Sequence, residues 1–321
     1  VGGVLMFKRN FIPVFILFII FLFVMKPGIV SEGVFNGLKI WVNNMIPYLL
    51  PMSILSNILL QYNFLYRMSD KLSFLSNRIF NSKYAFIPYF ISFVVGYPSG
   101  AMTINTMASY KRIDSREANS LITFTNNCSF QFMAGAVAFS MLGDFNLYKY
   151  IVVPHLLSAV FIGIILRKSD VYSTVANEKR QKYISFYDAF NSSIYKSVAS
   201  ILSIGGVIVI FSVFSNFFDN ILISASEYFS LSTQLSDIIH SVSVGVLEIA
   251  NGCSVAASST LPMDVRLIII NFLISFSGIS VIFQTVAVTN DFDFDIGNYI
   301  FYRAVQGIIS AIICIGMLFI T

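Results

Sequence analysis

Long apolar segments separated by short polar connections set the strongest limit on what this chain can fold into. They predict helices near residues 11–25, 48–66, 84–95, 118–142, 147–166, 198–218, 234–250, 265–290 and 297–320. Apolar residues make up 56% of the chain and charged residues only 11%, whereas a soluble domain carries roughly a quarter charged residues. Too few polar groups remain to cover a water-soluble surface. The pattern therefore predicts an all-α polytopic membrane protein whose solvent is the lipid bilayer.

The charged and metal-binding residues argue against several other classes. The net charge of +4 comes from basic residues in short clusters between apolar segments, as the positive-inside rule predicts, and not from a basic stripe with interleaved aromatics. We therefore expect no nucleic-acid partner. The cysteines and histidines, which have no disulfide or metal-ligand spacing, are Cys128, Cys253, Cys314, His155 and His240. We expect no metal site and no cofactor, and a lone histidine such as His240 is more often structural.

The N-terminal segment and three amphipathic stretches complete the membrane assignment. The apolar residues 11–25 follow two basic residues, as in a signal peptide, but Lys26-Pro27-Gly28 comes next and no small-residue cleavage site does. We therefore expect an uncleaved first helix, with Met6 as an alternative start and disorder before it. Amphipathic stretches that we expect to lie along the membrane interface are residues 33–47, 68–82 and 185–197.

The two halves of the chain carry similar features at an offset of about 151 to 155 residues. The matched pairs are Phe35-Asn36 with Phe190-Asn191, Gly96–Gly100 with Glu248–Gly252, and Asn126–Ser129 with Ser277–Ser280. A competing register, which aligns Asn127-Cys128-Ser129 with Gly252-Cys253-Ser254, breaks the other two matches. The first register predicts a duplication, with an N-terminal helix (1–30), a first repeat (31–166), a cytoplasmic linker (167–184) and a second repeat (185–321).

The charges that flank equivalent segments indicate how the two halves are oriented. The loop after the second predicted helix has an excess of basic residues, Arg67, Lys71, Arg78 and Lys83 against Asp70. Its counterpart carries only acidic residues, Asp219, Glu227 and Asp237. Equivalent loops on opposite sides of the membrane predict an inverted-topology repeat, which is typical of transporters with a substrate site at the repeat interface. The acidic group Asp291, Asp293 and Asp295 fits less well, because the same topology places it in the cytoplasm.

Polar interruptions of the apolar segments are the candidate sites, because unpaired backbone groups are costly in lipid unless they are buried in protein or line a polar cavity. The turn Gly96–Gly100 joins two apolar segments and predicts a re-entrant hairpin whose tip offers free backbone NH groups and the Ser99 hydroxyl. The alternative is a surface loop. The run Thr123–Ser129 predicts an unwound turn whose carbonyls can hold a cation. The alternative there is hydrogen bonding between helices.

The second half supplies two further interruptions. Glu248 lies deep in an apolar segment, where burying a carboxylate in the membrane costs free energy. A functional role as a substrate partner, proton carrier or cation ligand is therefore the default hypothesis for it. Its structural alternative is an ion pair with Arg266 or Arg303. The small polar run 275–280, with Gln284 one turn later, predicts either a helix break or a tight packing face. The predicted substrate-binding residues are Pro98, Ser99, Gly100, Thr125, Asn126, Asn127, Ser129, Glu248, Asn251, Gly252, Ser277, Gly278, Ser280 and Gln284.

These four motifs, in this order, resemble the YlbJ-type sporulation integral membrane proteins of spore-forming bacteria, which belong to the nucleoside-recognition (Gate) family. That family is distantly similar to concentrative nucleoside transporters and to the gate region of ferrous iron transporters. The resemblance covers about residues 10–320, and the residues that carry it are Gly96–Gly100, Phe124–Asn127, Leu247–Gly252 and Gly278–Ser280 with Gln284. Ala250 and Ile282-Phe283 depart from the pattern, where polar residues are usual, and leave the substrate open.

The resemblance implies one re-entrant hairpin and one discontinuous helix per repeat. It also implies transport of a small polar or anionic solute, dipicolinate, from the mother cell towards the forespore across the outer forespore membrane, for spore cortex formation and core maturation. Coupling to Na⁺ or H⁺ and homo-oligomerisation are compatible with it, and Glu248 suits a coupling role better than contact with a dicarboxylate. The alternatives are a nucleoside transporter and a membrane scaffold for the spore envelope. An enzyme is not expected, because no nucleophile–base pair or metal set has sensible spacing.

Overall fold

The structure is a computed structural model that describes residues 2–62, 64–167 and 184–320, and all regular structure in these ranges is helical. The predicted cytoplasmic linker lies outside the described residues except at its ends, Arg167 and Ile184. By length and composition, four stretches of the described chain can cross a membrane: Phe145–Ile165, Phe186–Asp219, Met263–Val288 and Ile296–Ile320. A fifth is possible if Pro13–Met25 and Pro27–Asn43 form one span, although a bend of 98° separates them.

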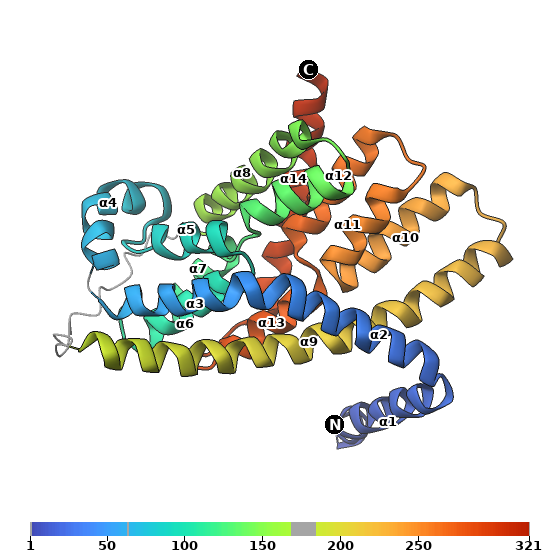
Figure 1. Cartoon of the computed structure of the whole chain (residues 1–321), viewed down its shortest axis with the longest axis horizontal. Helices are drawn as coiled ribbons and strands as arrows, with labels where there is room; N and C mark the ends of the chain where they lie inside the picture. The colour runs from blue at the N-terminus through green and yellow to red at the C-terminus, as the bar shows by residue number, and fades with distance from the viewer. Residues whose placement is uncertain (1, 63, 168–183, 321) are drawn as a thin grey trace.

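The same order of elements occurs in both halves (Figure 1). The first half contains α1 (Gly2–Met25), α2 (Pro27–Ile40), the π-helical turn η1 (Trp41–Met45), α3 (Ile46–Gln61), α4 (Phe64–Phe80), α5 (Phe86–Val95), α6 (Ser99–Ser109), α7 (Ser115–Thr125), the π-helix η2 (Gln131–Met141), the 3₁₀ turn η3 (Phe145–Tyr148) and α8 (Lys149–Ile165). The second contains α9 (Phe186–Tyr228), α10 (Thr233–Leu247), α11 (Ile249–Ser258), α12 (Met263–Phe276), α13 (Gly278–Val288) and α14 (Ile296–Ile320).

Each half thus runs from a long helical segment through a helical hairpin and a broken helix to a final helix. The long segment is α2–α3 or α9, the hairpin α5–α6 or α10–α11, the broken helix α7–η2 or α12–α13, and the final helix α8 or α14. Only the first half has an extra amphipathic helix, α4, in this position. The predicted continuous helices at 118–142 and 265–290 are each two helices, because the polar runs inside them do break the backbone.

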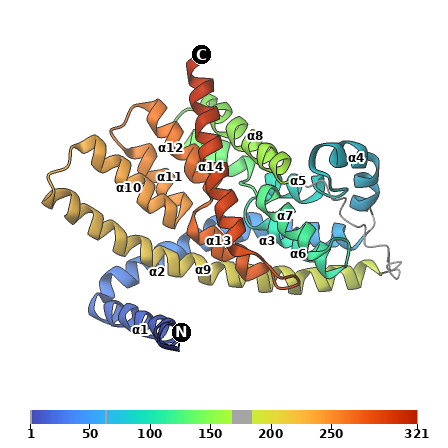
Figure 2. The same ribbon diagram turned by 180° about the vertical axis from the view of Figure 1, so that it is seen from behind.

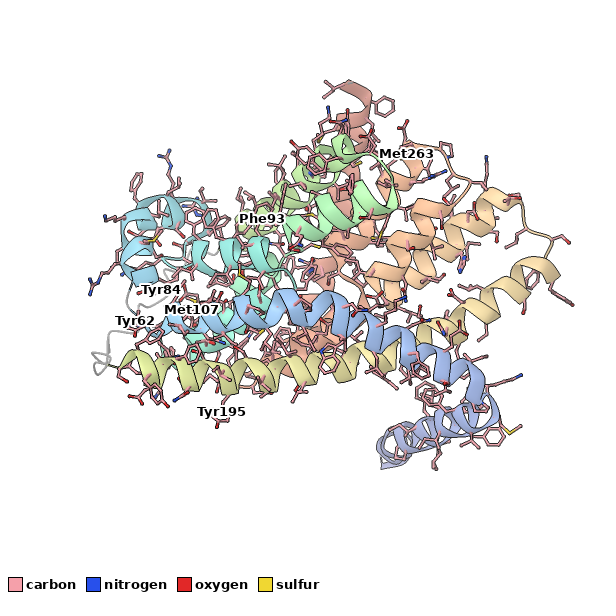
Figure 3. All side chains as sticks on the ribbon, viewed as in Figure 1. Tyr62, Tyr84, Phe93, Met107, Tyr195 and Met263 are labelled. Carbon is pink, nitrogen blue, oxygen red and sulfur yellow. The ribbon has the colours of Figure 1, made fainter. Side chains whose placement is uncertain are left out.

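The two hairpins open towards opposite ends of the molecule. Figures 1 and 2 place α4 and the start of α5 at one end, and the junction of α9 with α10 at the other. Tyr84, just before the first hairpin, and Met263, just after the second, lie correspondingly far apart in Figure 3. Within each half the hairpin packs against its broken helix, and α14 and α8 pack together between the halves. The turns of both hairpins therefore lie in the interior.

Residues 185–197, expected to lie along the membrane interface, lead into the first part of helix α9. That helix runs without interruption over 43 residues and packs along α2 and α3, with Phe186, Tyr187 and Tyr195 exposed. Its polar side chains meet polar partners on α3. Ser53 donates to the Ser197 hydroxyl (2.9 Å), Asn57 Nδ2 donates to the same oxygen (3.1 Å), and Gln61 Nε2 donates to Ser193 (2.8 Å). Hydrogen bonding between helices explains the polarity that the sequence pattern attributed to an interface.

Small residues bring α2 and η1 close to α9. A Cβ atom on Gly37 would lie 2.8 Å from the Cα of Val209, so only glycine allows this approach. The indole of Trp41 covers Gly205, where a Cβ would lie 2.5 Å from the ring. Trp41 Nε1 also donates to the carbonyl oxygen of Ile201 (3.1 Å), which fixes the ring in place. The contact is a close small-residue packing of the kind that membrane helices use.

We expect Gly205→Val to destabilise the protein by about 1–3 kcal/mol, the usual cost of overpacking, because the Trp41 ring cannot move without losing its hydrogen bond. Gly206→Val is the matched control, since a Cβ there meets nothing within 4 Å. Thermal unfolding of the purified variants in detergent measures both effects. Equal unfolding temperatures for the two variants would contradict the packing described for α2, η1 and α9.

Candidate functional site

In the first half, the tip of the hairpin rests on the break of the discontinuous helix. Gly100, at the start of α6, lies so close to the end of α7 that a Cβ would be 2.6 Å from the Thr125 carbonyl oxygen and 2.7 Å from the Asn126 Cα. The backbone NH of Ala101 donates to Asn126 Oδ1 (3.3 Å). The two interruptions predicted separately from the sequence are therefore one structural unit, and Gly100 is the residue that permits the contact.

The second half repeats this arrangement. Ser277 and Gly278 break the helix with positive φ angles of 76° and 73°. A Cβ on Gly278 would lie 3.1 Å from the carbonyl oxygen of Gly245, which belongs to the hairpin. Glu248 forms the turn between α10 and α11, where its Oε2 accepts a hydrogen bond from the backbone NH of Asn251 (2.8 Å). An N-cap of this kind satisfies a free NH group at the start of α11.

Hydrogen bonds join the two tip-and-break units across the middle of the molecule. The Tyr97 hydroxyl of the first hairpin donates to the carbonyl oxygen of Ile274, just before the second break (3.0 Å). Asn126 Nδ2 donates to the hydroxyls of Thr285 and Tyr299, both at 3.0 Å. One buried cluster also contains Cys128 from the first break together with apolar residues of α11 and α12. The first hairpin tip and both helix breaks therefore meet in one buried centre, and the second hairpin packs on it through Ile249 and Cys253.

Arg303 on α14 is the charged residue of this centre. It is fully buried, and its Nη1 donates to the carbonyl oxygen of Asn126 (3.2 Å) and to Gln306 Oε1 (2.7 Å). Its Nη2 donates to the Tyr97 hydroxyl, and the guanidinium lies 5.3 Å from the centre of the Tyr97 ring. Within the described ranges no carboxylate pairs with it. A buried cation without a counter-ion is expensive and calls for a functional explanation.

The polar atoms of the centre are not all satisfied by the protein. Four buried atoms in or next to it lack a hydrogen-bond partner within the described chain: Asn127 Oδ1, Ser277 Oγ, Arg303 Nε and Gln306 Nε2. Leaving such an atom unpaired costs about 1–3 kcal/mol, so few are found in a folded protein. They come from both helix breaks and from α14. We define these four residues with Tyr97, Asn126 and Tyr299 as the central cluster.

The structure already uses some of the polar groups expected to be available at the first hairpin and break. The NH groups of Ser99 and Ala101 donate to Gly96 O and Asn126 Oδ1. The Ser99 hydroxyl lies 3.5 Å from the carbonyl oxygen of Ile91 in its own hairpin. The carbonyl of Asn126 does hold a cation, but that cation is the guanidinium of the protein itself.

The remaining predicted residues differ in how close they lie to the centre. Pro98 and Gly252 are buried in the hairpins, and Gly252 packs directly on Gly245. The Thr125 and Ser129 hydroxyls bond to Leu121 O and Phe132 N within their own segment. Gln284 Nε2 donates to Ser280 Oγ (3.2 Å), so these two side chains share one face as expected, and both are buried.

Asn251 faces α9, where its Nδ2 lies 3.5 Å from the Ser215 hydroxyl, and Glu248 caps the helix on which Asn251 lies. Glu248 forms no ion pair with either predicted arginine in the part of the chain that the structure describes. Arg266 instead donates to the carbonyl oxygens of Leu261 (2.6 Å) and Ala257 (2.9 Å). The structural alternative for Glu248, a pair with Arg266 or Arg303, is therefore not formed.

His155 adds a serine–histidine contact that the sequence spacing did not reveal. Its Nδ1 lies 2.8 Å from the Ser275 hydroxyl, and its Nε2 accepts a hydrogen bond from the backbone NH of Cys128 (3.2 Å). A neutral imidazole that accepts at Nε2 carries its proton on Nδ1, so it donates to Ser275 and cannot deprotonate that hydroxyl. The contact joins the two breaks and gives Ser275 no general base.

Two comparisons with known proteins find similar sequences. Residues 42–145 match the family described as Gate, nucleoside recognition. The chain is also 25% identical over 336 aligned positions to the sporulation integral membrane protein YlbJ of Bacillus subtilis (strain 168), an alignment covering 93% of this chain and 80% of that protein. The chain is therefore similar to a YlbJ-type membrane protein. The Gate match contains the first hairpin and break, whereas Glu248 and Arg303 lie beyond it. No solved structure matches the chain.

Proposed function

We propose that this chain transports a small organic anion across a membrane, with the central cluster as the binding site. The observation that carries the proposal is Arg303, a fully buried guanidinium with no carboxylate partner among the described residues. A carboxylate of the solute would supply the missing counter-ion. The carboxylate would also accept a hydrogen bond from the unpaired Arg303 Nε, because a planar guanidinium donates directional hydrogen bonds to carboxylates.

The hairpins support an alternating-access mechanism around that site. They open towards opposite ends of the molecule and their tips meet the two helix breaks, as expected for an inverted-topology repeat of residues 31–166 and 185–321. At the end occupied by the first hairpin, the α13–α14 loop is bound to α6 of that hairpin and to α7. Asn105 Nδ2 donates to Asp291 Oδ2 (2.7 Å), and Asn119 Nδ2 donates to the carbonyl of Asp293 (2.6 Å). The central cluster is enclosed, which suits an occluded state between inward and outward access.

Dipicolinate is the solute that we infer, because the relative is a sporulation membrane protein and an aromatic dicarboxylate matches a buried arginine beside tyrosine rings. The expected direction is from the mother cell towards the forespore, across the outer forespore membrane. Coupling to H⁺ or Na⁺ through Glu248, and assembly into homo-oligomers, belong to the same proposal. The family description favours a second solute class, nucleosides, which carry no carboxylate and give Arg303 no counter-ion.

Exchange of labelled solute across proteoliposomes tests the proposal. Vesicles that contain the purified protein and unlabelled dipicolinate should accumulate labelled dipicolinate saturably, whereas protein-free vesicles should not. Unlabelled dipicolinate should compete, and uridine or adenosine should not. Accumulation of nucleosides in place of dipicolinate would select the second class, and no exchange of either solute would favour a scaffold in spore-envelope assembly.

A further inference from the structure

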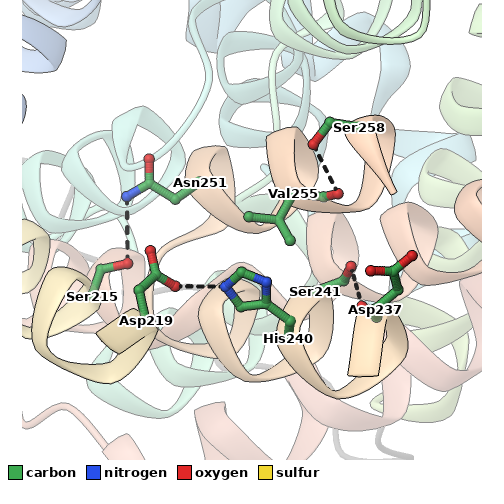
Figure 4. Close-up of polar contacts among 8 residues, drawn as sticks. All are labelled: Ser215, Asp219, Asp237, His240, Ser241, Asn251, Val255 and Ser258. Atoms are coloured by element: carbon green, nitrogen blue, oxygen red, sulfur yellow. Dashed lines mark hydrogen bonds and ion pairs between the residues drawn. The ribbon is translucent and has the colours of Figure 1, made fainter. Parts of the chain in front are cut away.

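A strip of polar side chains lies between α9 and the second hairpin, outside the central cluster. Figure 4 shows Ser215 and Asp219 on α9 facing His240 on α10 and Asn251 on α11. Glu248 joins α10 to α11 at the inner end of the strip. We call these five residues the polar seam. The polar seam stands out because the surrounding helices are apolar. Ionisable and polar side chains within membrane helices often mark ion pathways and proton relays.

The outer end of the polar seam is an ion pair that solvent can reach. His240 Nε2 lies 2.8 Å from Asp219 Oδ1, and the two side chains are 28% and 35% exposed. It is one of two side-chain ion pairs in the described ranges, and the other, Lys83 with Asp70, lies at α4. An imidazole can take up and release a proton, and an adjacent carboxylate can balance the charge of the protonated ring. The exposed pair therefore offers a group that exchanges protons with the aqueous phase.

The inner end of the polar seam reaches the enclosed carboxylate. Ser215 lies one helical turn from Asp219 on α9, so the two side chains occupy the same face. Its hydroxyl is 3.5 Å from Asn251 Nδ2, and the backbone NH of Asn251 donates to Glu248 Oε2 (2.8 Å). Glu248 is only 5% exposed, so a proton can reach it only along a polar route. The polar seam lines one face of this hairpin with polar groups of that kind.

We propose that the polar seam carries protons between the aqueous phase and Glu248, with the Asp219–His240 pair as its outer proton-binding site. This inference rests on the proposed function and specifies its coupling ion. A proton from water binds the neutral His240 ring, whose positive charge Asp219 balances. It then passes to the Glu248 carboxylate, which becomes a neutral acid, while the ring returns to its neutral form. His240 and Glu248 are about 12 Å apart along α10, so water molecules must bridge the seam.

The other charged groups that the structure describes around α10 either bind other partners or are exposed. Asp237, on the same helix, accepts hydrogen bonds from the backbone NH and the hydroxyl of Thr260 (2.8 and 2.7 Å). On α12, Arg266 is bound to carbonyl oxygens of the hairpin, and Asp264 is exposed in the first turn. Cys253 on α11 is buried among apolar residues, and α13 carries no Asp, Glu, Lys, Arg or His. Asp219 is the charged group that contacts His240 in the described part of the chain.

A metal ion is a less suitable occupant of the polar seam. No group of three or more His, Cys, Asp or Glu residues in the described part of the chain is arranged to hold one. Sodium could still bind oxygen atoms alone, so the experiment includes a sodium gradient. Its result separates a proton route from a cation site at the same place.

The experiment compares two assays on the same proteoliposomes of the full chain. Exchange of labelled dipicolinate at equal pH needs no net movement of protons, whereas uptake driven by a pH gradient does. For His240→Gln and Asp219→Asn we expect pH-driven uptake to fall at least about tenfold, since loss of a proton-transfer group has effects of this size or larger. Exchange should stay within about twofold of wild type. Asp219→Glu, which keeps the carboxylate, should retain pH-driven uptake. Asp237→Asn, the matched control outside the polar seam, should retain both activities.

Each outcome decides a different claim. Wild-type vesicles that exchange dipicolinate but respond only to a sodium gradient, or to no gradient, would overturn the proton route alone. The same follows if His240→Gln keeps wild-type pH-driven uptake. Wild-type vesicles that exchange no dipicolinate would overturn the proposed function, and the proton route with it. Loss of exchange in His240→Gln together with loss of its pH-driven uptake would show a structural role and would also overturn the route.

Discussion

Replacing Arg303 with glutamine is expected to reduce dipicolinate exchange at least about thirtyfold, because removing the partner of a desolvated charge costs about 2–5 kcal/mol. The guanidinium is the cation available to a solute carboxylate in the central cluster. A glutamine side chain could interact with that carboxylate only through its uncharged amide dipole. Glutamine can still donate to the Asn126 carbonyl, which Arg303 Nη1 now contacts at 3.2 Å. The variant also removes an unpaired buried charge, so it should fold at least as well as wild type.

Arg266→Gln is the matched control for this prediction. Arg266 also donates to backbone carbonyls, at 2.6 and 2.9 Å, but it lies at the open end of the second hairpin. Exchange by this variant should remain close to wild type. Arg303→Lys should keep part of the activity, because it retains the charge but loses the planar fork. If Arg303→Gln exchanged dipicolinate at the rate of Arg266→Gln, the central cluster would not be the anion site.

Glu248→Gln is expected to lose uptake driven by an ion gradient by about a hundredfold, because the amide can neither take up a proton nor carry the charge that attracts a cation. The fold should survive. The glutamine oxygen can accept the hydrogen bond from Asn251 N that Glu248 Oε2 accepts now, so the free energy of unfolding should change by about 1 kcal/mol. Exchange without a gradient should persist. Uptake and exchange in proteoliposomes, with gel filtration as the measure of folding, check these expectations.

Glu117→Gln provides the comparison for a buried carboxylate outside the site. Glu117 lies in the first turn of α7, where its Oε1 accepts a hydrogen bond from Ser82 (2.6 Å). We expect this variant to keep gradient-driven uptake. Glu248→Gln activity at the wild-type level, or loss of uptake in both variants alike, would remove the special role of Glu248.

The helix breaks were predictable because lipid makes them costly. The runs at 96–100, 126–129, 248–252 and 277–280 place polar or helix-breaking residues where an uninterrupted helix would need apolar ones, and each coincides with a break in the structure. The contact of each tip with its own break was not predictable, since it depends on close approach at Gly100 and Gly278. Sequence shows that a glycine is present but not what its missing side chain makes room for.

Arg303 and Tyr97 hold the centre together through contacts that the sequence pattern does not predict. The sequence offers Arg303 as a possible partner of Glu248, and an arginine eight residues into an apolar 25-residue helix is itself a functional signal. The Tyr97 hydroxyl bonds to Ile274 and Arg303 only because the fold brings α12 and α14 beside the first hairpin. These contacts join residues 177 and 206 positions apart, which no local pattern encodes.

Direct binding of labelled dipicolinate to the purified protein in detergent tests the central claim without any requirement for vesicles or gradients. Equilibrium dialysis of the wild-type chain should show saturable binding that unlabelled dipicolinate displaces and nucleosides do not. The same measurement on Arg303→Gln should show binding weakened at least about thirtyfold. Saturable binding that is unchanged in Arg303→Gln, or no saturable binding to the folded wild-type protein, would contradict an anion site at the buried meeting point of the two helix breaks.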